Sequence, residues 1–237
     1  MGKKVGSKPD ILYHGTATHI FNPDLTFNSD GIYLNKELFL KGEELPFKSK
    51  HFIQNTMAAI GACVSLNVDH NAIKTGISSY KPLSRRFSVL KSNPLIIDDF
   101  AHNPDGITAT IKSTAKMSEG TLHIVFAIRG SRGELINQLN AEAVVNAIKN
   151  VNNSLLITSS AEVVDHLNTV NDSERKVVID IFKEQNIEYI FKNELFDALN
   201  YTIQKARTTD TILLIGAQGM DPANEILSRI FRSEQDL

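Results

Sequence analysis

The segment from Pro94 to Gly106 constrains the fold of this chain more than any other stretch. Residues 95–97 form a short apolar run typical of a buried strand in a parallel sheet. Aspartate, asparagine and proline residues follow this run, and Pro104 suits the first position of a helix. The pattern therefore predicts a strand, a polar turn and a helix, the repeating unit of an α/β domain.

The polar turn stands where α/β proteins collect their ligands, outside the carboxyl ends of the strands. Four polar residues occupy this turn and are candidates for contacts with a nucleotide or a substrate: Asp98, Asp99, His102 and Asn103. Alternatively, the aspartate and asparagine side chains only cap the helix that follows. The residues by themselves leave both interpretations open.

Length and charge restrict the class of protein. The chain has 237 residues, enough for one large or two small domains, and its formal net charge is -2. A nucleic-acid-binding surface would normally be strongly basic, so we expect no nucleic-acid partner. No apolar run reaches the roughly 20 residues that span a bilayer, and Cys63 is the only cysteine, which excludes an intrachain disulfide. We expect a cytoplasmic protein with no membrane partner.

Strand and helix patterns alternate regularly in the second part of the chain, which predicts a mostly parallel sheet with helices on its faces. Expected strands lie at 87–90, 95–97, 122–127, 155–158, 188–190 and 211–215, and expected helices at 104–117, 135–149, 173–185, 194–206 and 222–231. The first part is less regular. It suggests a few antiparallel strands, including 11–13 and 31–34, and two helices at 52–66 and 71–80.

Residues 99–105, Asp-Phe-Ala-His-Asn-Pro-Asp, resemble the signature that opens the C-terminal domain of the Mur ligase family, which includes the folylpolyglutamate synthetases. The resemblance extends over about residues 30–237. It implies a Rossmann-like C-terminal α/β domain at 85–237, preceded by a remnant of the central domain at 1–84. Within the family, the loop sequences are most similar to those of an archaeal synthetase of methanogens, which closes a ring on a nickel tetrapyrrole coenzyme.

Two further segments carry nucleotide-binding roles in this resemblance. Residues 49–59 are similar to the family's His-Asn-x-x-Asn helix, in which Asn55 matches the asparagine whose amide meets adenine, although Phe52 replaces the first asparagine. Residues 81–90 are similar to the Gly-Arg-x-Glu segment, in which Arg86 matches a phosphate-binding arginine and Arg85 stands where glycine is usual. Without the resemblance, these segments read as a core helix and a solvated basic turn.

The resemblance also assigns roles within the polar turn. Asp99 would accept hydrogen bonds from the nucleotide ribose, and His102 would orient Asp99 or touch phosphate. We therefore expect Asp99→Ala and Arg86→Ala to leave the fold intact and to weaken nucleotide binding.

The loop after residue 127 has two arginines and two glycines in five residues, 129–133. Glycines let the backbone approach an anion, a helix amino terminus favours negative charge, and arginines supply charge-assisted hydrogen bonds. The pattern predicts an anion site with Arg129, Ser131 and Arg132 as candidate substrate-binding residues. A plain turn is the alternative interpretation.

A second strand-end loop contains Thr158, Ser159 and Ser160, which are typical of a helix cap. In the family, the corresponding loop helps to recognise the substrate that supplies the nucleophile. The resemblance therefore adds these three residues to the substrate-binding candidates. The strand at 211–215 is followed by Gly216 and Gly219, where the family has a Gly-Lys-Gly-His-Glu type of turn.

Mur ligases hold the ATP phosphates and Mg²⁺ at a Gly-x-x-x-x-Gly-Lys-[Ser/Thr] loop, and this sequence contains no such segment. We expect the chain to need a partner that carries this loop, and ATP and Mg²⁺ to bind in the assembled ligase. His14 and His19 have no third ligand at a suitable spacing, so we expect no metal site of the chain's own.

Three hypotheses remain for the reaction. A ring-closing ligase would pair Arg129 and Arg132 with carboxylates of a tetrapyrrole. An amide-forming ligase, joining a carboxylate-bearing small molecule to an amino acid or peptide, would need a pocket for a free amine near residues 158–160. A non-catalytic module would bind nucleotide or a second chain without turnover.

Overall fold

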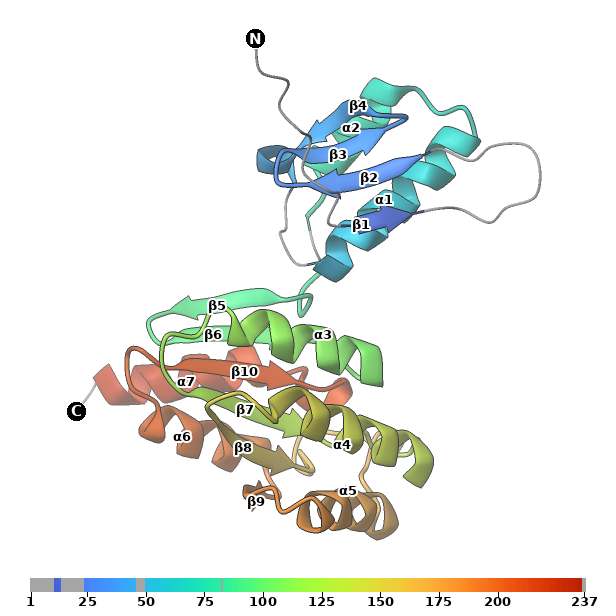
Figure 1. Ribbon diagram of the computed structural model, residues 1–237. Coiled ribbons are helices and arrows are strands. Elements are labelled where there is room, and N and C mark those ends of the chain that lie inside the picture. The colour runs from blue at the N-terminus through green and yellow to red at the C-terminus, as the bar shows by residue number, and fades with distance from the viewer. Residues whose placement is uncertain (1–10, 14–23, 46–49, 82, 236–237) are drawn as a thin grey trace. The chain divides into compact units, whose positions relative to one another are not determined.

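The computed structural model describes residues 11–13, 24–45, 50–81 and 83–235. The chain divides into two compact units, Met1–Pro82 and Leu83–Leu237 (Figure 1). This boundary lies two residues before the one expected from the sequence, between residues 84 and 85. His14 and His19 lie outside the described residues.

The first unit combines an antiparallel sheet with two helices. Its strands are β1 (Ile11–Tyr13), β2 (Leu25–Asn28), β3 (Gly31–Leu34) and β4 (Glu37–Lys41), in this order across the sheet. A short 3₁₀ helix, η1 (Gly42–Glu44), precedes α1 (Lys50–Ser65) and α2 (His70–Ser78). Met57 and Ile60 of α1 are buried in one cluster with Leu25 and Ile32 of the sheet. The predicted antiparallel strands and the two helices are thus confirmed.

The second unit contains a mixed sheet in the order β5-β6-β10-β7-β8-β9. These strands are β5 (Ser88–Ser92), β6 (Leu95–Asp99), β7 (Leu122–Ala127), β8 (Asn153–Thr158), β9 (Tyr189–Lys192) and β10 (Thr211–Ile215). Only β5 runs antiparallel to its neighbour, and the other pairings are parallel. This confirms the predicted α/β fold with a mostly parallel sheet.

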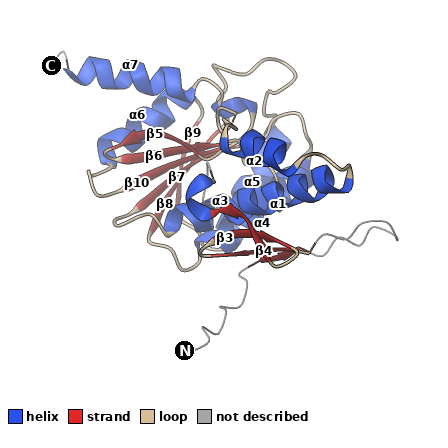
Figure 2. Ribbon diagram, turned by 90° about the horizontal axis from the view of Figure 1, so that it is seen from above, coloured by secondary structure: helices blue, strands red, loops and turns tan. Residues whose placement is uncertain are grey.

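Helices cover both faces of this sheet (Figures 1 and 2). One face packs against α3 (Pro104–Ala115), α4 (Glu134–Ile148) and α5 (Asp172–Glu184), and the other against α6 (Leu195–Lys205) and α7 (Ala223–Gln235). Side chains of a strand alternate between faces, so Leu213 of β10 joins the first cluster and Leu214 the second. Burial on both faces explains why β7 and β10 consist mostly of apolar residues.

The strand order places a topological switch point at β10. The chain passes from β6 to β7, β8 and β9 through helices on one face, and α6 then returns it to a position between β6 and β7. Right-handed crossovers require a return in the opposite direction to use the opposite face. The loops that follow β10 and its two neighbours therefore leave the sheet toward different faces, the arrangement at which α/β proteins bind ligands.

The predicted strands and helices of the second unit are all present, with ends that differ by at most four residues. No helix among the described residues is both long and apolar enough to cross a bilayer.

Candidate functional site

The candidate site lies at the carboxyl edge of the parallel strands in the second unit. Asp98 and Asp99 end β6, Arg129 follows β7, and Thr158 ends β8. Because these strands are parallel, their carboxyl ends meet at one edge. Only Asn55 among the predicted site residues belongs to the first unit, where it is exposed on α1.

Arg85 is the buried centre of this edge, and sequence reasoning did not select it. Its Nε lies 3.1 Å from Asp98 Oδ2, and its guanidinium donates to the carbonyls of Gly216 (2.6 Å) and Ala217 (2.8 Å) and to Asp221. Only 9% of Arg85 is exposed. One side chain thus ties β6 to the loop between β10 and α7.

The backbone of Arg85 explains its place in the sequence. Its φ angle is +60°, in the left-handed region that costs a residue other than glycine about 1–2 kcal/mol. Glycine is usual at this position in the family motif, as noted above. Arginine at this position adds a buried ion pair and hydrogen bonds that glycine could not make.

Asp98 is the acidic partner in this pair. Burial raises the pKa of Asp98 to about 6, although the Arg85 guanidinium acts to lower it, and the charges of Asp99 and Asp221 add to the rise. Its carboxyl group therefore takes up a proton well above the pH at which an exposed aspartate does.

Asp99 also stabilises the local backbone, a role that the sequence did not indicate. It is 6% exposed, and its Oδ2 accepts a 2.7 Å hydrogen bond from the backbone N–H of Phe87. This bond holds the segment before β5 against the end of β6. That Asp99→Ala leaves the fold intact stays a prediction, but the substitution removes a buried acceptor from a backbone donor, so we expect it to lower stability.

Arg86 and His102 both contact Phe100. The guanidinium carbon of Arg86 lies 5.1 Å from the ring centroid of Phe100, and Arg86 is half-buried. His102 packs edge-on against the same ring and donates from Nδ1 to the Phe100 carbonyl at 2.8 Å. Its Nδ1 thus serves the local backbone, so the alternative in which His102 orients Asp99 receives no support from this contact.

Asn103 is the helix cap that the alternative interpretation described. Its Oδ1 accepts a 2.9 Å hydrogen bond from Gly106 N, and Pro104 begins α3 directly after it. The predicted contact between Asn103 and a nucleotide stays a prediction.

The backbone N–H groups of the glycine-rich loop after β7 already bind a carboxylate, and this carboxylate is a side chain of the protein itself. The carboxylate of Glu174, at the start of α5, accepts hydrogen bonds from the backbone N–H groups of Ser131 (3.0 Å), Arg132 (2.7 Å) and Gly133 (2.7 Å). Glu174 is 0% exposed. Burial alone would raise the pKa of Glu174, but these backbone donors and that of Asn171 lower it overall.

This finding corrects the predicted anion site. The physical argument for an anion at this backbone was sound, but the loop's amides hold an internal carboxylate. The guanidinium of Arg132 is also engaged, with the Leu167 carbonyl (3.2 Å) and Asn168 Oδ1 (3.3 Å). Both arginines therefore make hydrogen bonds within the protein, with Arg132 exposed and Arg129 half-buried.

Arg129 is held by α4 with part of its guanidinium unused. The side chain of Asn137 bonds both the N–H (3.1 Å) and the carbonyl (2.8 Å) of Arg129. Arg129 Nη1 and Asn140 Nδ2 reach the same carbonyl, that of His102, at 3.5 and 3.1 Å. Burial lowers the pKa of Arg129, and the charge of Arg132 adds to this effect.

Several polar atoms at this edge are buried without a hydrogen-bond partner among the described residues. They include Arg129 Nε, Asn140 Oδ1, Ser159 Oγ and Ser160 Oγ. A buried polar atom without a partner costs about 1–3 kcal/mol, so such a group at a ligand-binding edge indicates a contact completed by a ligand or water. Asn140, which the sequence did not suggest, thus joins the candidate site.

Residues 158–160 do not cap a helix, because α5 begins only at Asp172 and is capped by Asn171. Thr158 Oγ1 instead donates to the Asn193 carbonyl (3.3 Å) and accepts from Ser160 N (2.9 Å). Ser160 is 0% exposed, and its Oγ would lie 3.2 Å from a Cβ atom added to Gly219. The β8 and β10 loops therefore meet at these residues.

The family model described as Mur ligase, glutamate ligase domain matches residues 85–218. A UDP-N-acetylmuramate–L-alanine ligase of Lachnospira eligens is 32% identical over 154 residues, which cover 60% of this chain and 33% of the relative. The corresponding ligase of Clostridium acetobutylicum is 34% identical over 102 residues, covering 42% and 22%.

Solved structures share the fold. A UDP-N-acetylmuramate–alanine ligase from Thermotoga maritima matches with a TM-score of 0.60 and 20% identity, over 95% of this chain and 46% of that one. A pseudomurein peptide ligase type C from Methanothermus fervidus matches with a TM-score of 0.60 and 22% identity, over 88% and 40%. The chain spans less than half the length of each of these proteins. By the family model that covers most of its second unit, the chain belongs to the Mur ligase family through its glutamate ligase domain.

Proposed function

We propose that this chain supplies the C-terminal domain of an ATP-dependent ligase that activates a carboxylate as an acyl phosphate and joins it to an amine. Family membership and the names of the relatives, which include an alanine ligase and a peptide ligase, support the reaction class. One observation carries the proposal at the level of the site. The buried atoms without partners, Arg129 Nε and Asn140 Oδ1, lie at the ligand-binding edge of the sheet together with the seryl hydroxyls after β8.

The nucleotide contacts are proposed for Arg86 and Asp99. A carboxylate accepts several hydrogen bonds, and the position of Asp99 at the end of β6, together with the family resemblance, supports a contact with a ribose hydroxyl. The half-buried Arg86 has a permanently charged fork that suits phosphate. Asn55 is proposed to meet the adenine, and its exposure on α1 is compatible with this role.

Mg²⁺ does not need a protein cage for this chemistry. No group of three or more potential metal-ligating side chains is present among the described residues. Mg²⁺ bound with ATP keeps several waters and is held largely through the phosphates, and we propose that the metal arrives with the nucleotide. The protein residues would bind and orient the nucleotide and the substrate.

On the substrate side, Arg129 is proposed to pair with an anionic group, because its Nε is buried and unused. Ser159 and Ser160 would offer hydroxyls to the group that supplies the nucleophile. Closure of a ring on a nickel tetrapyrrole remains a second candidate, in which Arg129 and Arg132 would pair with carboxylates, although both guanidinium groups also donate to backbone carbonyls of the protein.

Calorimetry with ATP and Mg²⁺ tests this proposal, first on the chain alone and then on its mixture with a protein that carries the phosphate loop. We expect turnover only in the mixture. In the mixture, Arg86→Ala and Asp99→Asn should each weaken ATP binding about tenfold, because each removes a charge-assisted hydrogen bond. Arg229→Ala, on the exposed side of α7, is the matched control and should leave it unchanged.

Two results would overturn the proposal. Unchanged ATP affinity in both site variants would remove the assigned nucleotide contacts. The absence of binding and turnover in every mixture would instead indicate a non-catalytic module.

A further inference from the structure

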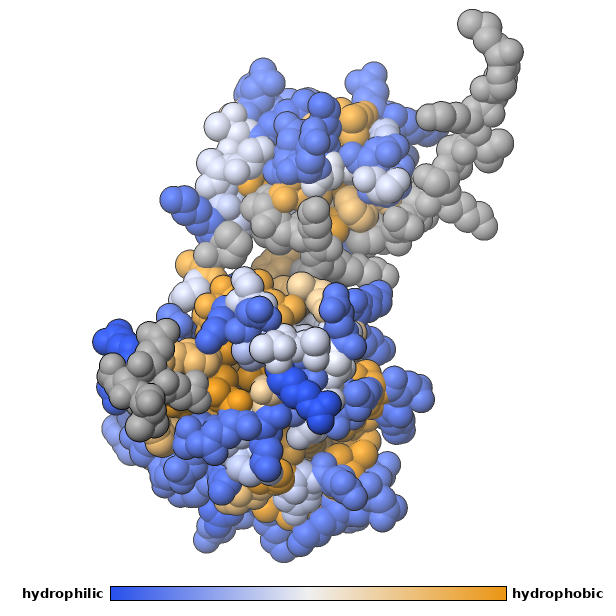
Figure 3. Space-filling model, turned by 90° about the vertical axis from the view of Figure 1, so that its left-hand side faces the viewer, coloured by the Kyte–Doolittle hydropathy of each residue, from blue (hydrophilic) through white to orange (hydrophobic). Residues whose placement is uncertain are grey.

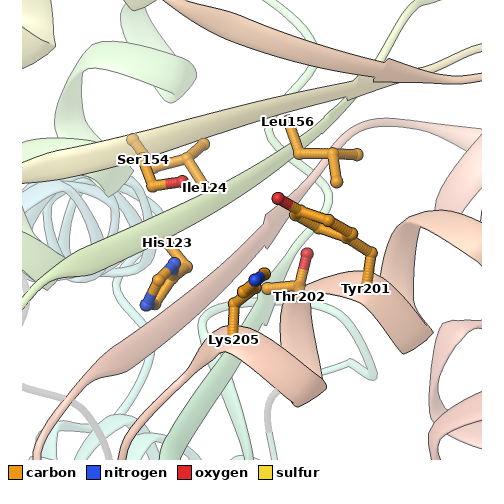
Figure 4. Close-up of a pocket in the computed structure, with 7 residues that line it drawn as sticks. All are labelled: His123, Ile124, Ser154, Leu156, Tyr201, Thr202 and Lys205. Carbon is orange, nitrogen blue, oxygen red and sulfur yellow. The ribbon is translucent and has the colours of Figure 1, made fainter.

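A cavity lies at the amino-terminal edge of the parallel strands, opposite the candidate functional site. His123 and Ser154 are the second residues of β7 and β8, and Tyr201 and Lys205 come from the end of α6 (Figure 4). The cavity has a volume of about 270 Å³. This edge of the second unit faces the viewer in Figure 3, where apolar residues are visible between hydrophilic ones.

The lining is apolar on one side and polar on the other. Leu156 and the ring of Tyr201 provide apolar surface, while Tyr201, Ser154 and His123 also bring polar atoms (Figure 4). Thr202 contributes less, because its hydroxyl donates to the Ala198 carbonyl at 2.8 Å. Such a mixture of apolar surface and a few polar groups is typical of small-molecule sites.

The charges around the cavity are positive. The Nζ atoms of Lys192 and Lys205 lie 5.6 and 5.8 Å from the ring centroid of Tyr201. No residue in the described lining is acidic. Asp210 Oδ2 lies 3.3 Å from Nε2 of the lining residue His123.

The charge of Asp210 is already satisfied by the protein. Its oxygens accept from Thr121 N and Arg207 N, each at 2.8 Å. Burial acts to raise the pKa of Asp210, but these hydrogen bonds and His123 lower it overall. Asp210 thus orients the imidazole and leaves the lysines without an acidic partner in the cavity.

We propose that this cavity binds a small amphipathic carboxylate, with its apolar body against Leu156 and Tyr201 and its carboxylate toward Lys205. The volume lies just below the ~300–1,000 Å³ of pockets for drug-sized ligands, which limits the ligand to a small molecule. The site is separate from the carboxyl edge and does not depend on the ligase reaction.

Benzoate is a suitable probe, because it has a flat apolar ring and one carboxylate. Binding to the full chain is followed by calorimetry and by the NMR signals of the His123 ring. We expect saturable binding with a Kd in the millimolar range, about −4 kcal/mol in free energy. Neutral benzamide and inorganic phosphate should each bind at least about fivefold more weakly, because one lacks the charge and the other the apolar body.

Lys205→Met is the test variant, and it changes an exposed residue in the last turn of α6. Lys183→Met is the matched control, because Lys183 occupies the last turn of α5 and is also exposed. A lysine there compensates the negative end of its helix in either case. The Lys205 variant should weaken benzoate binding at least about fivefold, and the control should leave it within about twofold.

Three results would overturn the proposal. The first is no saturable change at His123 up to about 50 mM benzoate, a concentration well above a millimolar Kd. The second is an equal effect of both lysine variants, which would indicate a general charge effect. The third is equal binding of benzoate and phosphate, which would leave the apolar surface without a role.

Discussion

Replacing Glu174 by glutamine should destabilise the loop that carries Arg129. The two oxygens of Glu174 accept four backbone hydrogen bonds, from Ser131, Arg132 and Gly133 of the loop and from Asn171. Glutamine keeps the size but replaces one oxygen by a donor, so two of the four N–H groups lose their acceptor.

The expected cost follows from these contacts. A buried donor without a partner costs about 1–3 kcal/mol, and the loop is exposed on its outer side, so water can reach part of it. We therefore take the lower half of the range and expect a loss of about 2–4 kcal/mol for the two donors. For a unit of this size, that corresponds to a decrease in Tm of roughly 4–16 °C.

Urea unfolding at neutral pH, followed by NMR signals of the second unit, measures this loss. Glu184→Gln is the control, because Glu184 is exposed at the end of the same helix; its effect should stay within about 0.5 kcal/mol. Equal stability of the two variants would refute the view that Glu174 holds the loop.

The pH dependence provides an independent check. Because the folded-state pKa of Glu174 is lowered, its stabilisation is present above the pKa of the unfolded chain and is lost as the pH falls through the folded value. This loss should be absent from Glu174→Gln. In Glu174→Ala, added acetate should restore part of the stability by occupying the vacated amides, whereas acetate should not stabilise the unsubstituted protein.

Three further predictions concern the other end of the site. Arg85→Met should lower the free energy of unfolding by about 3–5 kcal/mol, because it leaves Asp98 buried without its partner. The control Arg229→Met should change this free energy by less than about 0.5 kcal/mol. Urea unfolding of both variants measures the difference. The ¹³C signal of the Asp98 carboxyl should titrate with a midpoint at about pH 6. At a pH between the unfolded and folded pKa values of Asp98, the native state binds more protons than the unfolded state. The contribution of Asp98 to stability should therefore fall as the pH rises through this range. A midpoint near that of an exposed aspartate would contradict the raised pKa of Asp98. Asp99→Ala should destabilise more than Asp99→Asn, because asparagine retains an oxygen for Phe87 N; equal melting temperatures would show that this bond is dispensable.

Local sequence patterns determined the secondary structure of the second unit. Strands buried on both faces are rich in apolar residues, and the helices between them begin at recognisable signals, such as Asn103 followed by Pro104 before α3. The first unit was less readable. Its strands are four or five residues long where their burial is described, and they are separated by turns, so each offers a weaker pattern.

The sequence also located the loops of the candidate site, because the strand-helix alternation specifies which loops follow the carboxyl ends of strands. It did not reveal what those loops contact. Arg85 meets Gly216 and Ala217, more than 130 residues away, and Glu174 meets amides more than 40 residues away. The contacts of Arg85 depend on the return of the chain through α6, which places β10 beside β6, and those of Glu174 depend on β7 and β8 being neighbours in the sheet.

The sequence by itself therefore determined the elements, the edge at which ligands are expected and the arginine-rich character of one loop. Only the tertiary structure decided that Glu174 fills that loop, that Arg85 holds Asp98, and that Arg129 keeps an unused donor. The physical reason is that periodicity and capping act between neighbours in the chain, whereas hydrogen bonds between loops depend on strand order, which local patterns do not encode.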